Sequence, residues 1–170
     1  MKNNVKQMVL SAMFVALVYL ATAFVRVPSP FATGTGQIHT GTAVVFVVSI
    51  AFGPKMGAIS SIGMVLFNLT HGLALWAPIN LIVRPLMAVI FGSVARLKGA
   101  DGRNVFLNAA AGILGGLWLL PGMYLGELLV FQVPLSAPAV GILGNSLQIA
   151  LALIFGLPLI AVLNLHKAKL

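Results

Sequence analysis

The sequence predicts an all-α integral membrane protein with six transmembrane helices and both termini in the cytoplasm. Hydrophobic residues make up 60% of the 170 residues and charged residues only 7%, and the mean hydropathy is +1.09. A soluble domain carries roughly 25% charged residues, so this chain has too few polar side chains to cover a surface that faces water. The absence of cysteine excludes disulfides and thiolate metal sites.

Six apolar stretches, separated by breaks rich in Gly, Pro and polar residues, predict the helices of one membrane domain over residues 1–170. A helix needs roughly 20 residues to cross a bilayer, and the second and third stretches are short, with a tight turn at Gly53-Pro54 between them. Pro85 and Pro121 fall inside predicted helices, where neighbouring helices tolerate a kink. In chain order the six helices are predicted near residues 5–25, 39–52, 55–70, 78–97, 105–129 and 139–165.

The cations predict the orientation of these helices. With six crossings, eight Lys and Arg residues fall on one side of the membrane, and only Arg26 falls in a loop on the other side. Lys and Arg are retained in the cytoplasm, so both termini are predicted to be cytoplasmic. The cations form no patch or tail, which argues against a nucleic-acid partner. The eight are Lys2, Lys6, Lys55, Arg96, Lys98, Arg103, Lys167 and Lys169.

The first outer loop, residues 26–38, is long and reads RVPSPFATGTGQI. Long ordered loops frequently act as lids or binding loops. We therefore expect a lid over an outer site, and the alternative is a plain connector.

Arg84 and Glu127 are the only charges well inside apolar stretches. A charge within a bilayer costs several kcal/mol unless it is paired with an opposite charge, hydrated or part of a functional site. Most other strongly polar side chains also fall in the outer half, whereas the inner half holds little beyond serines and Asn108. This distribution predicts an outward-facing pocket that captures a small polar molecule rather than conducting it. The candidate lining residues are Gln37, His39, Asn80, Arg84, Trp118, Tyr124, Glu127, Asn145 and Gln148.

Most of these candidates also have a purely structural interpretation. Arg84 and Glu127 could neutralise each other as a buried ion pair. Asn145 and Gln148 could hydrogen-bond between helices, and His39 could be a helix-end residue. The two aromatic candidates could belong to the interfacial belt or to the core.

Ala12 and Ala16 in the first predicted helix form a stripe of small residues, at the spacing that lets membrane helices approach closely. The stripe could pack against another helix of this chain. It could equally be a docking face for another membrane protein.

Taken together, the chain resembles the substrate-binding S components of energy-coupling factor (ECF) vitamin transporters. The resemblance covers the whole chain: its length, six predicted helices, both ends inside, the extended first outer loop and the motif Ala12-Met-Phe-Val-Ala16. It implies high-affinity capture of a vitamin or precursor from outside, in a pocket made from the first outer loop and the outer parts of helices four to six. It also implies docking through Ala12 and Ala16 on a transmembrane coupling (T) subunit joined to two ATPase subunits. ATP hydrolysis would then topple the S component and release substrate inside.

The resemblance further implies a multi-pass protein of the prokaryotic plasma membrane that is not an enzyme. The chain is expected to hold no cofactor or metal, because ATP and Mg²⁺ are used by the ATPase subunits, and it contains no GxxxxGK[ST] motif. Arg84 would favour an anionic group and Glu127 an amine or hydroxyl donor. Among S components, the chain most resembles those for hydroxymethylpyrimidine or pyridoxine. The alternative function is a stand-alone homo-oligomeric transporter or channel.

Overall fold

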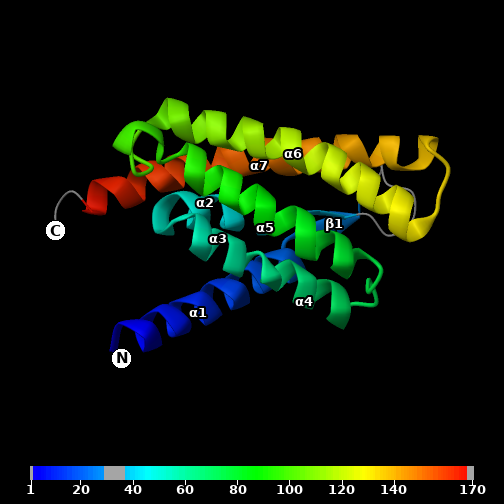
Figure 1. Ribbon diagram of the computed structural model, residues 1–170, viewed down its shortest axis with the longest axis horizontal. Helices are drawn as coiled ribbons and strands as arrows, with labels where there is room; N and C mark the ends of the chain where they lie inside the picture. The colour runs from blue at the N-terminus through cyan, green and yellow to red at the C-terminus, as the bar shows by residue number, and fades with distance from the viewer. Residues whose placement is uncertain (1, 29–36, 168–170) are drawn as a thin grey trace.

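The computed structural model describes residues 2–28 and 37–167, and helices make up most of them (Figure 1). The predicted all-α class therefore fits, apart from one short hairpin. In chain order the elements are α1 (Lys2–Phe24), β1 (Arg26–Pro28), β2 (Gln37–His39), α2 (Gly41–Phe52), α3 (Pro54–Ser60), α4 (Ile62–Thr70), α5 (Trp76–Val94), the 3₁₀ helix η1 (Leu97–Gly99), α6 (Val105–Phe131) and α7 (Ser136–Lys167).

Four helices among the described residues are long and apolar enough to cross a membrane: α1, α5, α6 and α7. α2 has only 12 residues, and the predicted third span is divided into α3, of 7 residues, and α4, of 9. Ser61 between them keeps helical dihedral angles (φ −63°, ψ −18°), so the chain does not reverse there. The count of six transmembrane helices and the cytoplasmic location of the termini remain predictions.

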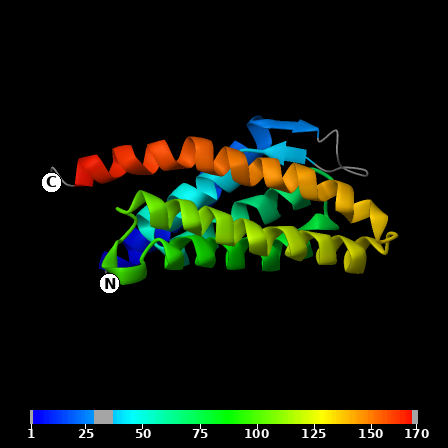
Figure 2. The ribbon, with the colours of Figure 1, turned by 90° about the horizontal axis from the view of Figure 1, so that it is seen from above.

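α5, α6 and α7 lie side by side along the long axis, and α2 packs against both α5 and α7 (Figures 1 and 2). The buried core lies among these four helices, where the ring of Phe46 meets the ring of Phe91 edge-on at 5.0 Å. α1 contacts α2, α3 and α4 on one side only, and most of its apolar surface is open. It is the least buried of the four long helices.

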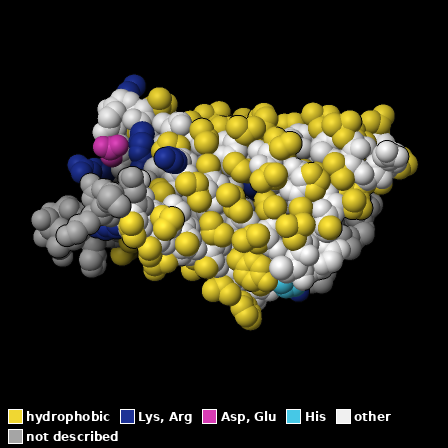
Figure 3. Space-filling view, turned by 60° about the horizontal axis from the view of Figure 1, so that its bottom comes forward, with side chains coloured by type: hydrophobic (Ala, Val, Ile, Leu, Met, Phe, Trp, Pro, Cys, Tyr) yellow, Lys and Arg dark blue, Asp and Glu magenta, His cyan; other side chains and the backbone are white. Residues whose placement is uncertain are grey.

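The start of α1 and the end of α7 lie at the same end of the molecule (Figure 1). Lys and Arg side chains gather at this end, and a broad hydrophobic surface covers much of the remaining face (Figure 3). We call the end that holds the start of α1 and the end of α7 the cationic end. Arg96 has a structural role here: it donates hydrogen bonds of 3.0 Å to the carbonyl oxygens of Ser49, Ile50 and Gly92. These bonds tie the last turn of α2 to the end of α5.

An antiparallel hairpin that was not predicted from the sequence lies partway along the molecule, beyond its middle as seen from the cationic end (Figures 1 and 2). β1 and β2 pair Arg26 with His39 and Pro28 with Gln37, and β2 lies against α7 (Figure 2). α2 begins at Gly41, two residues after the predicted start, because His39 belongs to the hairpin. Most of the predicted lid, residues 29–36, lies outside the described residues.

Gly63 sets the close approach of α4 to α1. A Cβ atom placed there would overlap the carbonyl oxygen of Val15 and lie 2.8 Å from the amide nitrogen of Tyr19. Because these are backbone atoms of another helix, only a shift of α1 could relieve the clash. We expect Gly63→Ala to lower the thermal unfolding midpoint by several degrees, since overpacking costs about 1–3 kcal/mol.

Thermal unfolding of purified protein in detergent measures this effect. Gly116→Ala is the matched control, because the three atoms nearest to a Cβ atom there are side-chain atoms of Ile149, at 3.2 Å or more. Equal midpoints for the two variants would show that the α1–α4 contact is not tight.

Candidate functional site

Arg84 is the centre of a polar group enclosed by the helices. Its side chain extends from α5 and is only 2% exposed. Its Nε donates to Oδ1 of Asn80 at 3.1 Å, one helical turn earlier. Its Nη1 donates to Oγ1 of Thr42 at 2.8 Å, and its Nη2 donates to Oε1 of Gln148 at 3.3 Å. The guanidinium thus joins α2, α5 and α7.

The acceptors of Arg84 are themselves held by further hydrogen bonds. The Thr42 hydroxyl donates to Oε1 of Gln148 at 2.9 Å, and Nε2 of Gln148 donates to the carbonyl oxygen of Gln37 in β2 at 3.2 Å. Nδ2 of Asn80 donates to Oδ1 of Asn68 in α4 at 3.2 Å. We call this set the Arg84 network: Thr42, Asn68, Asn80, Arg84, Gln148 and the Gln37 carbonyl.

The network hydrogen-bonds Arg84 but does not neutralise its charge. Every acceptor is a neutral amide or hydroxyl, and the bonds use three of the five N–H groups of the guanidinium. One N–H on each terminal nitrogen has no partner among the described residues. The chain has two acidic residues, and Asp101 lies 3.8 Å from Nε of Arg96 at the cationic end.

The remaining carboxylate, Glu127 in α6, forms no ion pair with Arg84, so the structural pair considered from the sequence is not present. Glu127 is 8% exposed and has no hydrogen-bond partner in the described part of the chain. Its Oε1 lies 3.3 Å from the position that a Cβ atom would take on Gly141 in α7. Asn145 donates to the carbonyl oxygen of Gly141 at 3.1 Å. Glu127 and Asn145 therefore meet the same turn of α7.

Trp118 and Tyr124 have packing roles in the structure. The indole Nε1 of Trp118 donates to the carbonyl oxygen of Val83 at 3.0 Å, and the residue is 36% exposed. The hydroxyl of Tyr124 donates to the carbonyl oxygen of Leu135 at 2.9 Å. Neither aromatic side chain bonds to the Arg84 network. These contacts are compatible with the structural interpretation, and a role in lining the site stays a prediction.

The two candidates from the outer loop lie in β2. The side chain of Gln37 accepts a hydrogen bond of 3.0 Å from Nη1 of Arg26, so only its carbonyl belongs to the network. His39 is partly buried, and its Nδ1 is enclosed without a hydrogen-bond partner among the described residues. This nitrogen is therefore available to a ligand or a water molecule.

His39 makes the stability of the protein depend on pH. Burial, and to a smaller extent the charge of Arg84, lower the pKa of His39 from 6.5 to about 3. Below pH 6.5 the unfolded chain takes up a proton that the folded chain does not accept until about pH 3, so stability falls across this window as the pH falls. At pH 5 we expect a loss of about 1–2 kcal/mol relative to pH 7.5.

Thermal unfolding of wild type and His39→Asn between pH 7.5 and 5 tests this expectation. The variant should lose less stability than the wild type as the solution is acidified. If stability fell equally with pH in the two proteins, His39 would titrate alike in the folded and unfolded states.

Three serines of the predicted dry half bond to carbonyl oxygens three or four residues earlier in the chain. Ser49 donates to the carbonyl oxygen of Val45, Ser60 to that of Gly57 and Ser61 to that of Ala58, at 2.6–2.7 Å. These hydroxyls are satisfied locally and do not extend the Arg84 network toward the cationic end. The arrangement supports capture rather than conduction.

Sequence reasoning left two members of the network, Thr42 and Asn68, out of the candidate site. The predicted topology places both in the outer half, with the other strongly polar side chains. Threonine is common in membrane helices and Asn68 falls near a helix end, so composition alone did not select them. Depth combined with their positions opposite Arg84 and Asn80 is the signal that identifies them.

Ala12 and Ala16 are exposed on the open face of α1. They are not packed against another helix of this chain, so the internal-packing interpretation is not supported. A stripe of small residues remains available at the surface.

The apolar helices enclose an un-neutralised cation and a separate buried carboxylate. Beyond these charges the serines are satisfied locally. These are the features of a membrane protein that captures a polar solute. The chain belongs to the family described as ECF-type riboflavin transporter, S component, whose model matches residues 2–165. No curated protein gives a match. The chain is thus a substrate-binding subunit of an ECF vitamin transporter, a multi-pass membrane protein and not itself an ATPase. Its family implies a T subunit, an ATPase module and a small vitamin substrate.

Proposed function

We propose that this chain captures a small heteroaromatic vitamin, or a precursor of one, that carries hydroxyl groups. The observation that supports this most directly is the state of the two buried charges. Arg84 has one N–H to spare on each terminal nitrogen, and Glu127 has no partner in the described residues. A ligand with ring acceptors would bond to Arg84, and its hydroxyl or amino groups would donate to Glu127.

Two kinds of ligand within this class have separate support. The matched family is named for riboflavin, whose ring carbonyls and sugar-alcohol chain offer both acceptors and donors. The two opposed charges also suit smaller heteroaromatic alcohols, hydroxymethylpyrimidine and pyridoxine. We favour these smaller ligands on the polar groups of the site, and riboflavin is the direct competitor in the test.

The decisive experiment identifies the molecule that co-purifies with the protein by mass spectrometry. It is followed by calorimetric titration of ligand-free protein with riboflavin, hydroxymethylpyrimidine and pyridoxine. One of the three should bind tightly and the other two much more weakly. Recovery of a ligand with no heteroaromatic ring, or no binding of any of the three, would overturn the proposed class.

Transport would then require partners. We propose that Ala12 and Ala16 dock on the T subunit and that two ATPase subunits use ATP and Mg²⁺ to drive release inside the cell. The stand-alone transporter is the competing function. Uptake into liposomes that contain this chain without ATPase subunits would favour the competitor, and uptake that depends on the complete complex would favour our proposal.

A further inference from the structure

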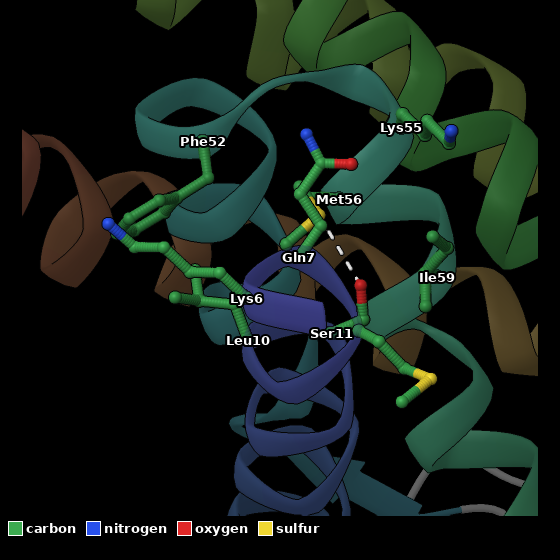
Figure 4. A pocket seen from close by; sticks show the side chains of 9 residues that line it. Lys6, Gln7, Leu10, Ser11, Phe52, Lys55, Met56 and Ile59 are labelled. Atoms are coloured by element: carbon green, nitrogen blue, oxygen red, sulfur yellow. Dashed lines mark hydrogen bonds between the residues drawn. The ribbon is translucent and has the colours of Figure 1, made fainter. Parts of the chain in front are cut away.

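A groove lies at the cationic end, and none of its lining residues belongs to the Arg84 network. It runs between the first half of α1 and the turn from α2 into α3, and its volume is about 680 Å³ (Figure 4). This size is ample for a small ligand or for a lipid headgroup with the start of its chains. The residues that line it are Lys6, Gln7, Met8, Leu10, Ser11, Phe52, Lys55, Met56 and Ile59.

The groove combines cationic rims with an apolar floor. Lys6 and Lys55 lie on opposite sides of it, with Met56 between them (Figure 4). Both lysines are exposed, and no acidic residue lines the groove. The single ion pair in the described part of the chain joins Arg96 to Asp101. The two ammonium groups are thus available to an anion.

The apolar floor continues onto a surface suited to hydrocarbon. Met8 is 66% exposed and Met13, further along the open face of α1, is 63% exposed. Ser11 reaches across the floor to the sulfur of Met56 at 3.5 Å, which holds α1 and α3 together beneath the groove. A ligand held between the lysines would thus lie at the head of an apolar strip.

We infer that this groove binds an anionic phospholipid. Its headgroup phosphate lies between Lys6 and Lys55, and in the subunit that is not docked on the T subunit an acyl chain follows the exposed face of α1. Charge complementarity carries the assignment, because basic pockets between membrane helices at the cation-rich side attract anionic headgroups. The flexible lysine stems can lie along the apolar floor while their ammonium groups meet the phosphate. The inference does not depend on which vitamin the outer site binds.

Native mass spectrometry of the purified protein with phosphatidylglycerol or phosphatidylcholine tests the inference. Each lysine near a membrane surface contributes about 1 kcal/mol toward an anionic lipid, so Lys6→Gln with Lys55→Gln should reduce the affinity for phosphatidylglycerol roughly 30-fold. Lys6→Arg with Lys55→Arg should keep it. The matched control is Lys98→Gln with Arg103→Gln, two exposed cations of the same end outside the groove.

Three results would overturn the inference. The first is unchanged phosphatidylglycerol binding by the folded Lys6→Gln/Lys55→Gln protein. The second is displacement of the lipid by millimolar inorganic phosphate, which would make the groove a site for a free anion. The third is unchanged lipid binding with lost assembly on the T subunit, which would make it a protein-docking surface. Thermal unfolding of each variant confirms that the lipid readout is taken on folded protein.

Discussion

Replacing Arg84 by Ala is expected to lower ligand affinity roughly 100-fold or more. A hydrogen bond to a charged group contributes about 1.5–3 kcal/mol, and the two free N–H groups offer two such bonds to the ligand. The substitution also removes the donor to Oδ1 of Asn80 and Oγ1 of Thr42, whereas Oε1 of Gln148 keeps the hydrogen bond from the Thr42 hydroxyl. Calorimetric titration of purified protein with the ligand identified by mass spectrometry measures the loss.

Two milder variants separate binding from folding. Arg84→Lys keeps the charge but not the planar fork, so we expect a stable protein with affinity reduced about tenfold or more. Glu127→Gln should weaken binding as well, because the amide is a poorer acceptor for a ligand hydroxyl. Arg103→Gln, an exposed cation at the other end, is the control. Wild-type affinity in folded Arg84→Lys and Glu127→Gln, with a lower folding yield for Arg84→Ala, would assign both charges a structural role only.

The second large effect is expected on uptake. Changing Ala12 and Ala16 to Leu should abolish ATP-driven uptake by the assembled transporter and leave substrate affinity unchanged. Both alanines are exposed on the open face of α1, so larger side chains are tolerated by the isolated chain. They would hold a partner helix away from α1, because close helix approach requires small residues.

The control for this experiment places the same substitution on another membrane-facing helix. Ala150 and Ala161 are exposed on α7, and changing them to Leu should leave uptake intact. Uptake by the complete complex is measured in liposomes, and binding is measured on the isolated subunit. Normal uptake by the Ala12→Leu/Ala16→Leu protein would place the docking face elsewhere.

Hydropathy predicted the long helices well because each is one continuous apolar run. α5, α6 and α7 fall within a few residues of their predicted bounds. The hairpin was missed since strands of three residues leave no period to detect. The division between α3 and α4 also escaped prediction, because Ser61 keeps helical angles and changes only the hydrogen-bonding pattern.

The candidate site was predicted in part. Arg84, Asn80 and Gln148 were chosen for their depth, and the structure brings them into one network. Trp118 and Tyr124, which were candidates as aromatic side chains, hydrogen-bond to backbone carbonyls outside this network. Depth in the membrane follows from position along the chain, whereas the rotation of a helix about its axis depends on its neighbours. Rotation decides which side chains meet.

The enclosed charge of Arg84 has a consequence for the empty protein. Without a ligand, a cation stays away from water with only neutral dipoles around it, so part of the folding free energy offsets its desolvation. A ligand that supplies acceptors recovers this energy and adds RT ln(1 + [L]/Kd) to the stability of the folded state. The true substrate should therefore be the compound that raises the unfolding temperature most. Thermal unfolding would identify it before any transport is measured.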